Sequence, residues 1–116
     1  IRVVCNFEDI KRCRKEIQGV QVNEGIINYI TSIVKATRNS PNLVLGASPR
    51  ASIALLLTAK TYAAMEGRNF VIPEDVKELA LPVLRHRIII KPEVGIDGLT
   101  NDDAIKSILT KVEVPR

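Results

Sequence analysis

One long segment, from Pro49 to about Glu66, constrains the fold more than any other. Its alanines, leucines and other apolar residues surround most of the circumference of a helix. A helix that is apolar on nearly every side must be covered by other elements, so we expect it at the centre of a bundle, with Tyr62 and Met65 as core residues. Aromatic residues make up only 3% of the chain and tryptophan is absent, so that core must be aliphatic.

Further helices are predicted on both sides of this segment from the spacing of apolar residues and from cap residues. Asn6, Asn23 and Thr100 each precede a segment of helical periodicity, as N-caps do. Pro82 is expected to kink or break its helix near the end. The predicted helices cover residues 7–18, 24–38, 49–66, about 73–84 and 101–112. We therefore expect residues 1–116 to form a single all-α domain, a helical bundle of about five helices.

Short β-prone runs lie between the helices. Residues 20–22 alternate in polarity and residues 88–90 are β-branched, so we expect them to form a small two-stranded pairing, 20–22 with 88–90. The apolar run 43–45 is expected to anchor the following loop to the core. Residues 92–99 contain two glycines and are predicted to form a flexible loop.

The sequence Gly46-Ala47-Ser48-Pro49-Arg50-Ala51 marks an unusual helix start. Ser48 is a good N-cap, since its hydroxyl can accept a hydrogen bond from a free backbone N–H of the first turn. Pro49 suits the first helical position because its fixed φ is already helical. Arg50 then adds positive charge at the positive end of the helix dipole, which costs stability unless an anion neutralises it. This combination favours a phosphate site; the alternative is that Arg50 points into water or caps a neighbouring helix.

The same hexapeptide resembles the sensor 2 motif in the C-terminal lid of MoxR-family AAA+ ATPases. The resemblance continues along the chain in the family's order. It covers Ala36-Thr37-Arg38, Gly67-Arg68-Asn69-Phe70-Val71-Ile72-Pro73-Glu74-Asp75-Val76, Val83-Leu84-Arg85-His86-Arg87 and Val112-Glu113-Val114-Pro115-Arg116. The chain departs from the family at the cap position Ile72, where Thr or Ser is usual. A missing cap bond there costs about 1 kcal/mol of stability.

The resemblance implies that Arg50 is the sensor 2 arginine, a catalytic residue that reaches the γ-phosphate of ATP held by another domain. Ser48, Pro49 and Arg50 are then the nucleotide-binding residues. The phosphate can belong to the same subunit or to its neighbour. The resemblance also implies ATP and Mg²⁺ as cofactors of the full-length protein and a ring oligomer, often a hexamer. It further implies a chaperone-like role in assembling or activating partners, among them proteins with von Willebrand factor A domains.

The chain lacks the residues that nucleotide hydrolysis needs. None of its six glycines belongs to a Gly-x-x-x-x-Gly-Lys loop, so we expect it to be part of an ATPase and to be inactive alone. Its first partners are then its own N-terminal AAA+ core and the neighbouring subunits. His86 lies between two arginines and is a poor candidate for a general base. Cys5 and Cys13 fit neither a zinc site nor a disulfide framework, so we expect no metal site and two reduced thiols.

Composition bears on location and on alternative functions. The chain has no apolar run long enough to span a membrane and no signal-peptide core, so we expect a cytoplasmic protein without a membrane partner. It starts at Ile1 rather than at methionine, which suggests a fragment of a larger protein. The net charge of +4 is too mild to indicate nucleic acid. The alternative is a free-standing module that binds nucleic acid through residues 11–15 and 85–91, or binds protein with Arg50 as an ion-pair partner. Among ATPases, the resemblance leaves open the lid of the related magnesium-chelatase-type group.

Overall fold

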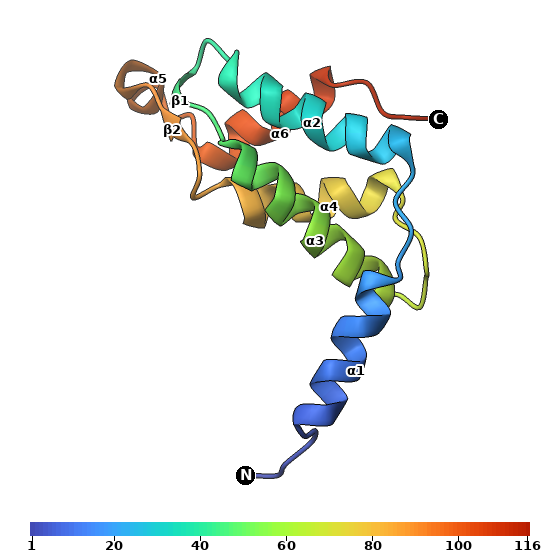
Figure 1. Cartoon of the computed structure of the whole chain (residues 1–116). Coiled ribbons are helices and arrows are strands. Elements are labelled where there is room, and N and C mark those ends of the chain that lie inside the picture. Colours follow the sequence, from blue (N-terminus) through green and yellow to red (C-terminus); the bar gives the residue numbers. More distant parts are fainter.

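The computed structural model describes residues 1–116 and shows a bundle of helices from which α1 projects (Figure 1). The molecule measures 50 × 40 × 20 Å along its principal axes. In chain order the elements are α1 (Phe7–Gln18), α2 (Glu24–Arg38), β1 (Leu43–Leu45), α3 (Pro49–Met65), α4 (Pro73–Leu84), β2 (Ile89–Ile90), α5 (Pro92–Ile96) and α6 (Asn101–Lys111). No helix combines the length and the apolar character that crossing a bilayer would need. The predicted helical bundle is confirmed.

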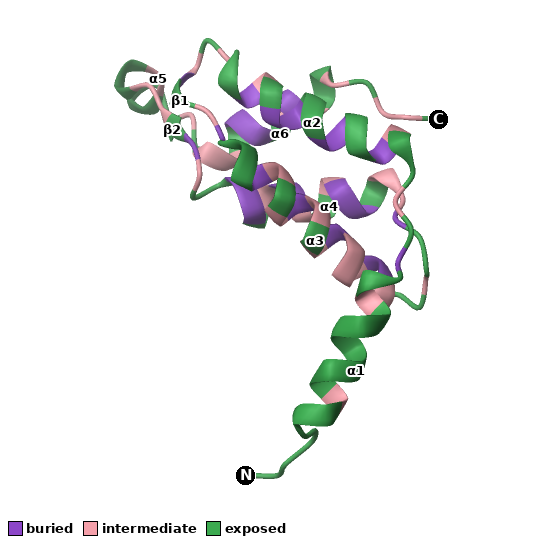
Figure 2. Ribbon diagram, in the orientation of Figure 1, coloured by how far each residue is buried: buried purple, intermediate pink, exposed green.

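The core is aliphatic and lies where α2, α3, α4 and α6 meet. Its fully buried side chains include Ile26, Ile33, Leu55, Leu84 and Ile105. Burying a side chain of this size stabilises the fold by roughly 1.5–3 kcal/mol. Figure 2 shows the buried residues concentrated on these four helices, whereas α1 is exposed along nearly its whole length and has no buried residue. Helix α1 is therefore an arm outside the core.

Helix α3 packs by one face only, which corrects the prediction that it is enclosed at the centre of the bundle. Its buried residues recur at every fourth position: Ala51, Leu55, Ala59 and Ala63. The opposite side exposes Ile53 and Leu57. Tyr62 is half-buried, and the prediction of Met65 as a core residue was wrong because its side chain is 79% exposed. An apolar circumference predicts burial, but it does not predict whether the same chain supplies the covering surface.

The two-stranded pairing exists, but the predicted partner of residues 88–90 was wrong. Strand β2 pairs antiparallel with β1. In this register Leu43 lies opposite Ile90 and Leu45 opposite Ile89. Residues 20–22 lie instead beside the α3–α4 connection, where Gln21 forms an isolated parallel bridge with Phe70. These short runs have similar β propensity, so the packing of the helices around them decides which two meet.

Two further predictions concern the end of the chain, and the second needs correction. Pro82 was predicted to kink or break its helix near the end; α4 continues through Pro82 and ends two residues later, at Leu84. Pro82 lies in the last turn, where the missing N–H removes one hydrogen bond without interrupting a following turn. The segment 92–99, predicted as a flexible loop, contains the short helix α5, with Pro92 at its first position. A proline there fixes a helical φ at no cost in hydrogen bonding.

Candidate functional site

The candidate residues lie together where α3 begins, at the end of that helix away from α1 (Figure 1). Ser48 is the N-cap, Pro49 and Arg50 follow in the first turn, and all three are exposed. The predicted helix start is confirmed. The predicted cap bond is not, because the Ser48 side chain makes no hydrogen bond to the first turn. The backbone of Ser48 has ordinary N-cap angles (φ −82°, ψ 169°), and its carbonyl accepts from the Ala51 amide at 2.9 Å, so the missing side-chain bond leaves one free first-turn amide, that of Arg50.

Arg50 has no partner within the chain. The three ion pairs are Arg12 with Asp9, Arg68 with Asp75, and Arg85 with Asp102. The first turn of α3 contains no acidic residue, and the backbone amide of Arg50 makes no hydrogen bond. Uncompensated positive charge therefore gathers at the positive end of the α3 dipole. An acid packed against Arg50, the sign of a purely structural arginine, is not found.

The chain just before Ser48 is held firmly against the end of α2. Ala47 is fully buried, and its amide donates a hydrogen bond to the Thr37 hydroxyl at 2.9 Å. Gly46 passes so close to α2 that a Cβ on it would lie 2.5 Å from the Cα of Arg38. Our reading of the sequence did not assign this role to Thr37 or Gly46. Their presence in the stretches that resemble the MoxR family is the one signal that could have suggested it.

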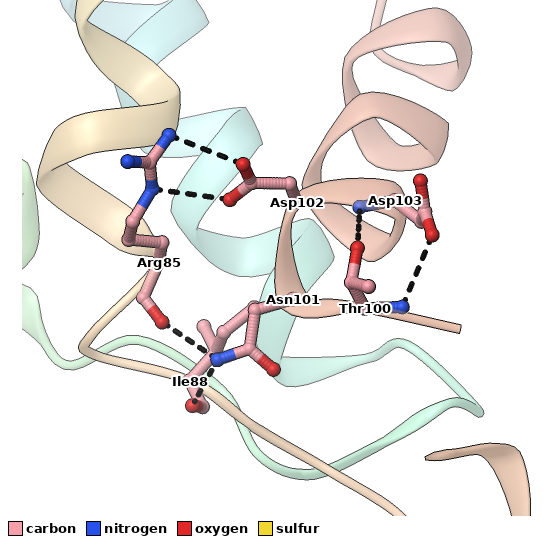
Figure 3. Close-up of polar contacts among 6 residues, drawn as sticks. All are labelled: Arg85, Ile88, Thr100, Asn101, Asp102 and Asp103. Atoms are coloured by element: carbon pink, nitrogen blue, oxygen red, sulfur yellow. Dashed lines mark hydrogen bonds and ion pairs between the residues drawn. The ribbon is translucent and has the colours of Figure 1, made fainter. Parts of the chain in front are cut away.

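The start of α6 has the opposite chemistry (Figure 3). The Thr100 hydroxyl accepts a hydrogen bond from the Asp103 amide, and the Asp103 carboxylate accepts one from the Thr100 amide, both at 3.1 Å. The hydrogen bond that the Thr100 amide donates to the carboxylate holds the pKa of Asp103 below its usual value. Arg85 donates two hydrogen bonds of 3.1 Å to Asp102. The Thr100 and Asp103 amides and the Arg85 guanidinium are therefore paired within the chain at this helix start, and two acidic residues lie in its first turn.

The segment that follows α4 is fastened to the same helix start. The Asn101 side-chain amide donates to the carbonyl of Arg85 at 2.7 Å and to that of Ile88 at 3.4 Å, as Figure 3 shows. The Arg87 guanidinium donates back to the Val83 carbonyl at 3.0 Å. Both arginines of the Arg85-His86-Arg87 run therefore have partners in the fold, unlike Arg50.

The start of α4 is closed by a buried ion pair. Ile72 cannot act as a side-chain cap, but its amide donates to the Asp75 carboxylate at 2.9 Å. Arg68 donates to both oxygens of the same carboxylate, at 2.7 and 2.6 Å, and the Asp75 side chain is only 1% exposed. Burial raises the pKa of Asp75, but the hydrogen bonds from Arg68 and Ile72 outweigh it and hold the pKa below the ordinary 3.8. The Asp75 carboxylate thus supplies one half of a capping box, and the bond that a Thr or Ser side chain at position 72 would add is absent, as predicted.

Comparison with known proteins identifies the family of this chain. Residues 35–108, which include the whole α3 start, match the AAA lid domain. The uncharacterized protein YeaC of Bacillus subtilis is 39% identical over 93% of this chain and 34% of its own length. Chaperone MoxR1 of Mycobacterium tuberculosis is 31% identical over 93% of this chain and 31% of its own length.

A solved structure supports the same assignment. A Cytophaga hutchinsonii protein assigned as an ATPase superposes with a TM-score of 0.89 at 36% identity, covering 94% of this chain and 36% of that one. The chain spans about a third of the length of these relatives. The chain therefore belongs to the AAA lid domain family, as a lid homologous to those of MoxR-family AAA+ ATPases.

Proposed function

We propose that this lid supplies Arg50 to the γ-phosphate of ATP in a MoxR-type AAA+ ATPase. The observation that carries the proposal is the exposed, unpaired guanidinium of Arg50 in the first turn of a helix whose cap residue, Ser48, makes no cap bond. A phosphate at this helix start meets a guanidinium, a free backbone amide and the positive end of the dipole. Each of these favours an anion.

The arrangement suits stabilisation of the transition state. During phosphoryl transfer, negative charge is spread over the oxygens of the γ-phosphoryl group, and a nearby arginine lowers its energy. The guanidinium of Arg50 would do this without first breaking an ion pair, because it has none in the lid. Because α3 packs with α2, α4 and α6 in one core, the lid would move as a rigid body, and its position would change with the nucleotide state.

The remaining parts of the ATPase are proposed for the full-length protein. ATP and Mg²⁺ would be bound by its N-terminal AAA+ core, and the lid itself has no group of three or more His, Cys, Asp or Glu residues suited to a metal. We further propose a cytoplasmic ring, often a hexamer, in which the core and the neighbouring subunits are the partners of the lid. We also propose that the full-length protein activates client proteins in a chaperone-like way, including clients with von Willebrand factor A domains. Its relationship to Chaperone MoxR1 supports this proposal.

A free-standing nucleic-acid-binding module is a weaker candidate. Its predicted surface combined the basic residues of α1 with residues 85–91. Arg85 is paired with Asp102, and Arg87 donates to a backbone carbonyl, so part of the charge of that surface is already engaged. Steeply salt-dependent binding of duplex by this chain would favour the module over the lid function.

Steady-state ATP hydrolysis and nucleotide affinity of the full-length protein test the proposal. We expect Arg50→Ala to lower kcat by a factor of about one hundred or more, because the arginine acts on the transition state. Arg50→Lys should restore only part of the rate, since an ammonium cannot make the planar two-pronged contact. Lys111→Ala, which removes an exposed cation from the last turn of α6, is the control. Unchanged hydrolysis and affinity in Arg50→Ala would show that the arginine is structural.

A further inference from the structure

Thr37 is a buried polar residue with a defined connection. Thr37 is 1% exposed, and it and Asp75 are the two buried residues outside the hydrophobic core cluster. Its hydroxyl donates to the Val34 carbonyl at 2.6 Å and accepts from the Ala47 amide at 2.9 Å. A buried hydroxyl that both donates and accepts is a fixed link rather than an adaptable one. This link joins the last turn of α2 to the residue directly before Ser48.

The backbone at this link has no free space. A Cβ on Gly46 would lie 2.5 and 2.6 Å from the Cα and N atoms of Arg38, and 2.7 Å from the carbonyl carbon of Thr37. The next residue, Ala47, has no exposed surface. The chain is therefore held against the end of α2 at Gly46 and Ala47, and Ala47 lies three positions before Arg50.

We propose that Thr37 is a positioning residue for Arg50, an inference that rests on the proposed contact between Arg50 and the ATP phosphate. Because the Ser48 side chain makes no cap bond, the first turn of α3 is fixed from behind, through the Ala47 amide. Thr37 does not touch the nucleotide in this arrangement. Contacts to a transition state require placement within about 0.5 Å, so a small shift of the α3 start is enough to slow hydrolysis.

Substitutions of Thr37 in the full-length protein test the positioning role. Thr37→Val replaces the hydroxyl by a methyl group of similar size and leaves the Ala47 amide buried without an acceptor. Thr37→Ser keeps the hydroxyl. The control is Thr31→Val, because Thr31 is an exposed residue of the same helix whose hydroxyl bonds only the Ile27 carbonyl. We expect Thr37→Val to lower kcat about tenfold, with Thr37→Ser near wild type and Thr31→Val unchanged.

A double-mutant cycle with Arg50→Ala separates positioning from a general loss of stability. If Thr37 acts through Arg50, Thr37→Val lowers kcat much less in the Arg50→Ala background than in the wild type. An equal factor in both backgrounds overturns the proposal, and so does an unchanged kcat in the single variant. If Thr37→Val does not fold, Thr37→Cys takes its place, because a thiol is a weak acceptor of similar size.

The same cycle distinguishes the two proposals from each other. If Arg50→Ala leaves hydrolysis unchanged, the proposed function itself fails. If Arg50→Ala slows hydrolysis and the folded Thr37 variants do not, the phosphate contact stands and only the positioning role is overturned.

Discussion

The starts of α3 and α6 are built in opposite ways. At α6, Thr100 and Asp103 satisfy each other's backbone amides, and Asp102 neutralises Arg85. At α3, the Ser48 side chain makes no cap bond, the first turn has no acid, and the Arg50 side chain has no partner. A stabilising cap is worth about 1 kcal/mol, and Ser48 is a residue that could provide it. The α3 start thus lacks a stabilising side-chain cap and leaves the amide and the guanidinium of Arg50 available to an anion from outside the chain.

The difference shows that rigidity and local capping are separate properties of a helix start. Helix α3 is fixed by a bond from α2 to Ala47 and by the close passage of Gly46, both of which lie behind its first turn. Helices α4 and α6 instead have carboxylates within their own first turns, Asp75 and Asp103, which accept from the amide of the N-cap residue. A helix start held from behind can be rigid and still present free donors to a ligand.

The largest effect is expected at the closed start of α4. Arg68→Ala leaves the Asp75 carboxylate buried without its cation, so we predict a loss of about 3–5 kcal/mol in the free energy of unfolding. Urea denaturation of the 116-residue chain, followed by circular dichroism, measures it. A loss below about 1 kcal/mol would mean that this helix start does not depend on its ion pair and would weaken the contrast with α3.

Low pH should destabilise the start of α4, because it protonates the Asp75 carboxylate. The folded pKa of Asp75 lies below 3.8, so the carboxylate contributes stability that is present above the unfolded pKa and is lost as the pH falls through the folded value. We predict that unfolding becomes easier below pH 3.8 and that Asp75→Asn removes this part of the pH dependence. Denaturation midpoints measured over that pH range provide the test. Equal pH slopes in the two proteins would contradict the prediction.

A smaller loss of stability is expected when the cap residues Thr100 and Ser48 are each replaced by alanine. Thr100→Ala removes a formed cap bond and should cost about 1 kcal/mol, whereas Ser48→Ala removes none and should cost close to zero. The free energies of unfolding of the two variants, measured side by side, test this. Equal losses would show that Ser48 does cap α3 in solution.

Local features of the sequence were sufficient to predict most of the helical fold. The bounds of α1 and α2 were predicted correctly because Asn6, Asn23 and the periodicity of the apolar residues act within a few residues of each helix. The helix start that carries the candidate residues was also predictable, since Ser48, Pro49 and Arg50 are consecutive, and their role at a phosphate stays a prediction.

Features that depend on contacts between distant segments could not be predicted. Strand β2 pairs with β1 because of how the helices place the two runs. The Thr37 hydroxyl meets an amide ten residues away. The exposure of Met65 depends on what surrounds the end of α3. In each case several arrangements satisfy the same local preferences, and packing selects one.

The most direct test compares Arg50→Ala with Arg85→Ala, by ATP hydrolysis in the full-length protein and by urea denaturation of the 116-residue chain. We predict that Arg50→Ala lowers kcat about one hundredfold and leaves the free energy of unfolding unchanged. Arg85→Ala should keep its kcat and lose less than about 1 kcal/mol, because its ion pair is partly exposed. The opposite result, a destabilised Arg50→Ala that hydrolyses ATP at the wild-type rate, would show that the open start of α3 is not a phosphate site.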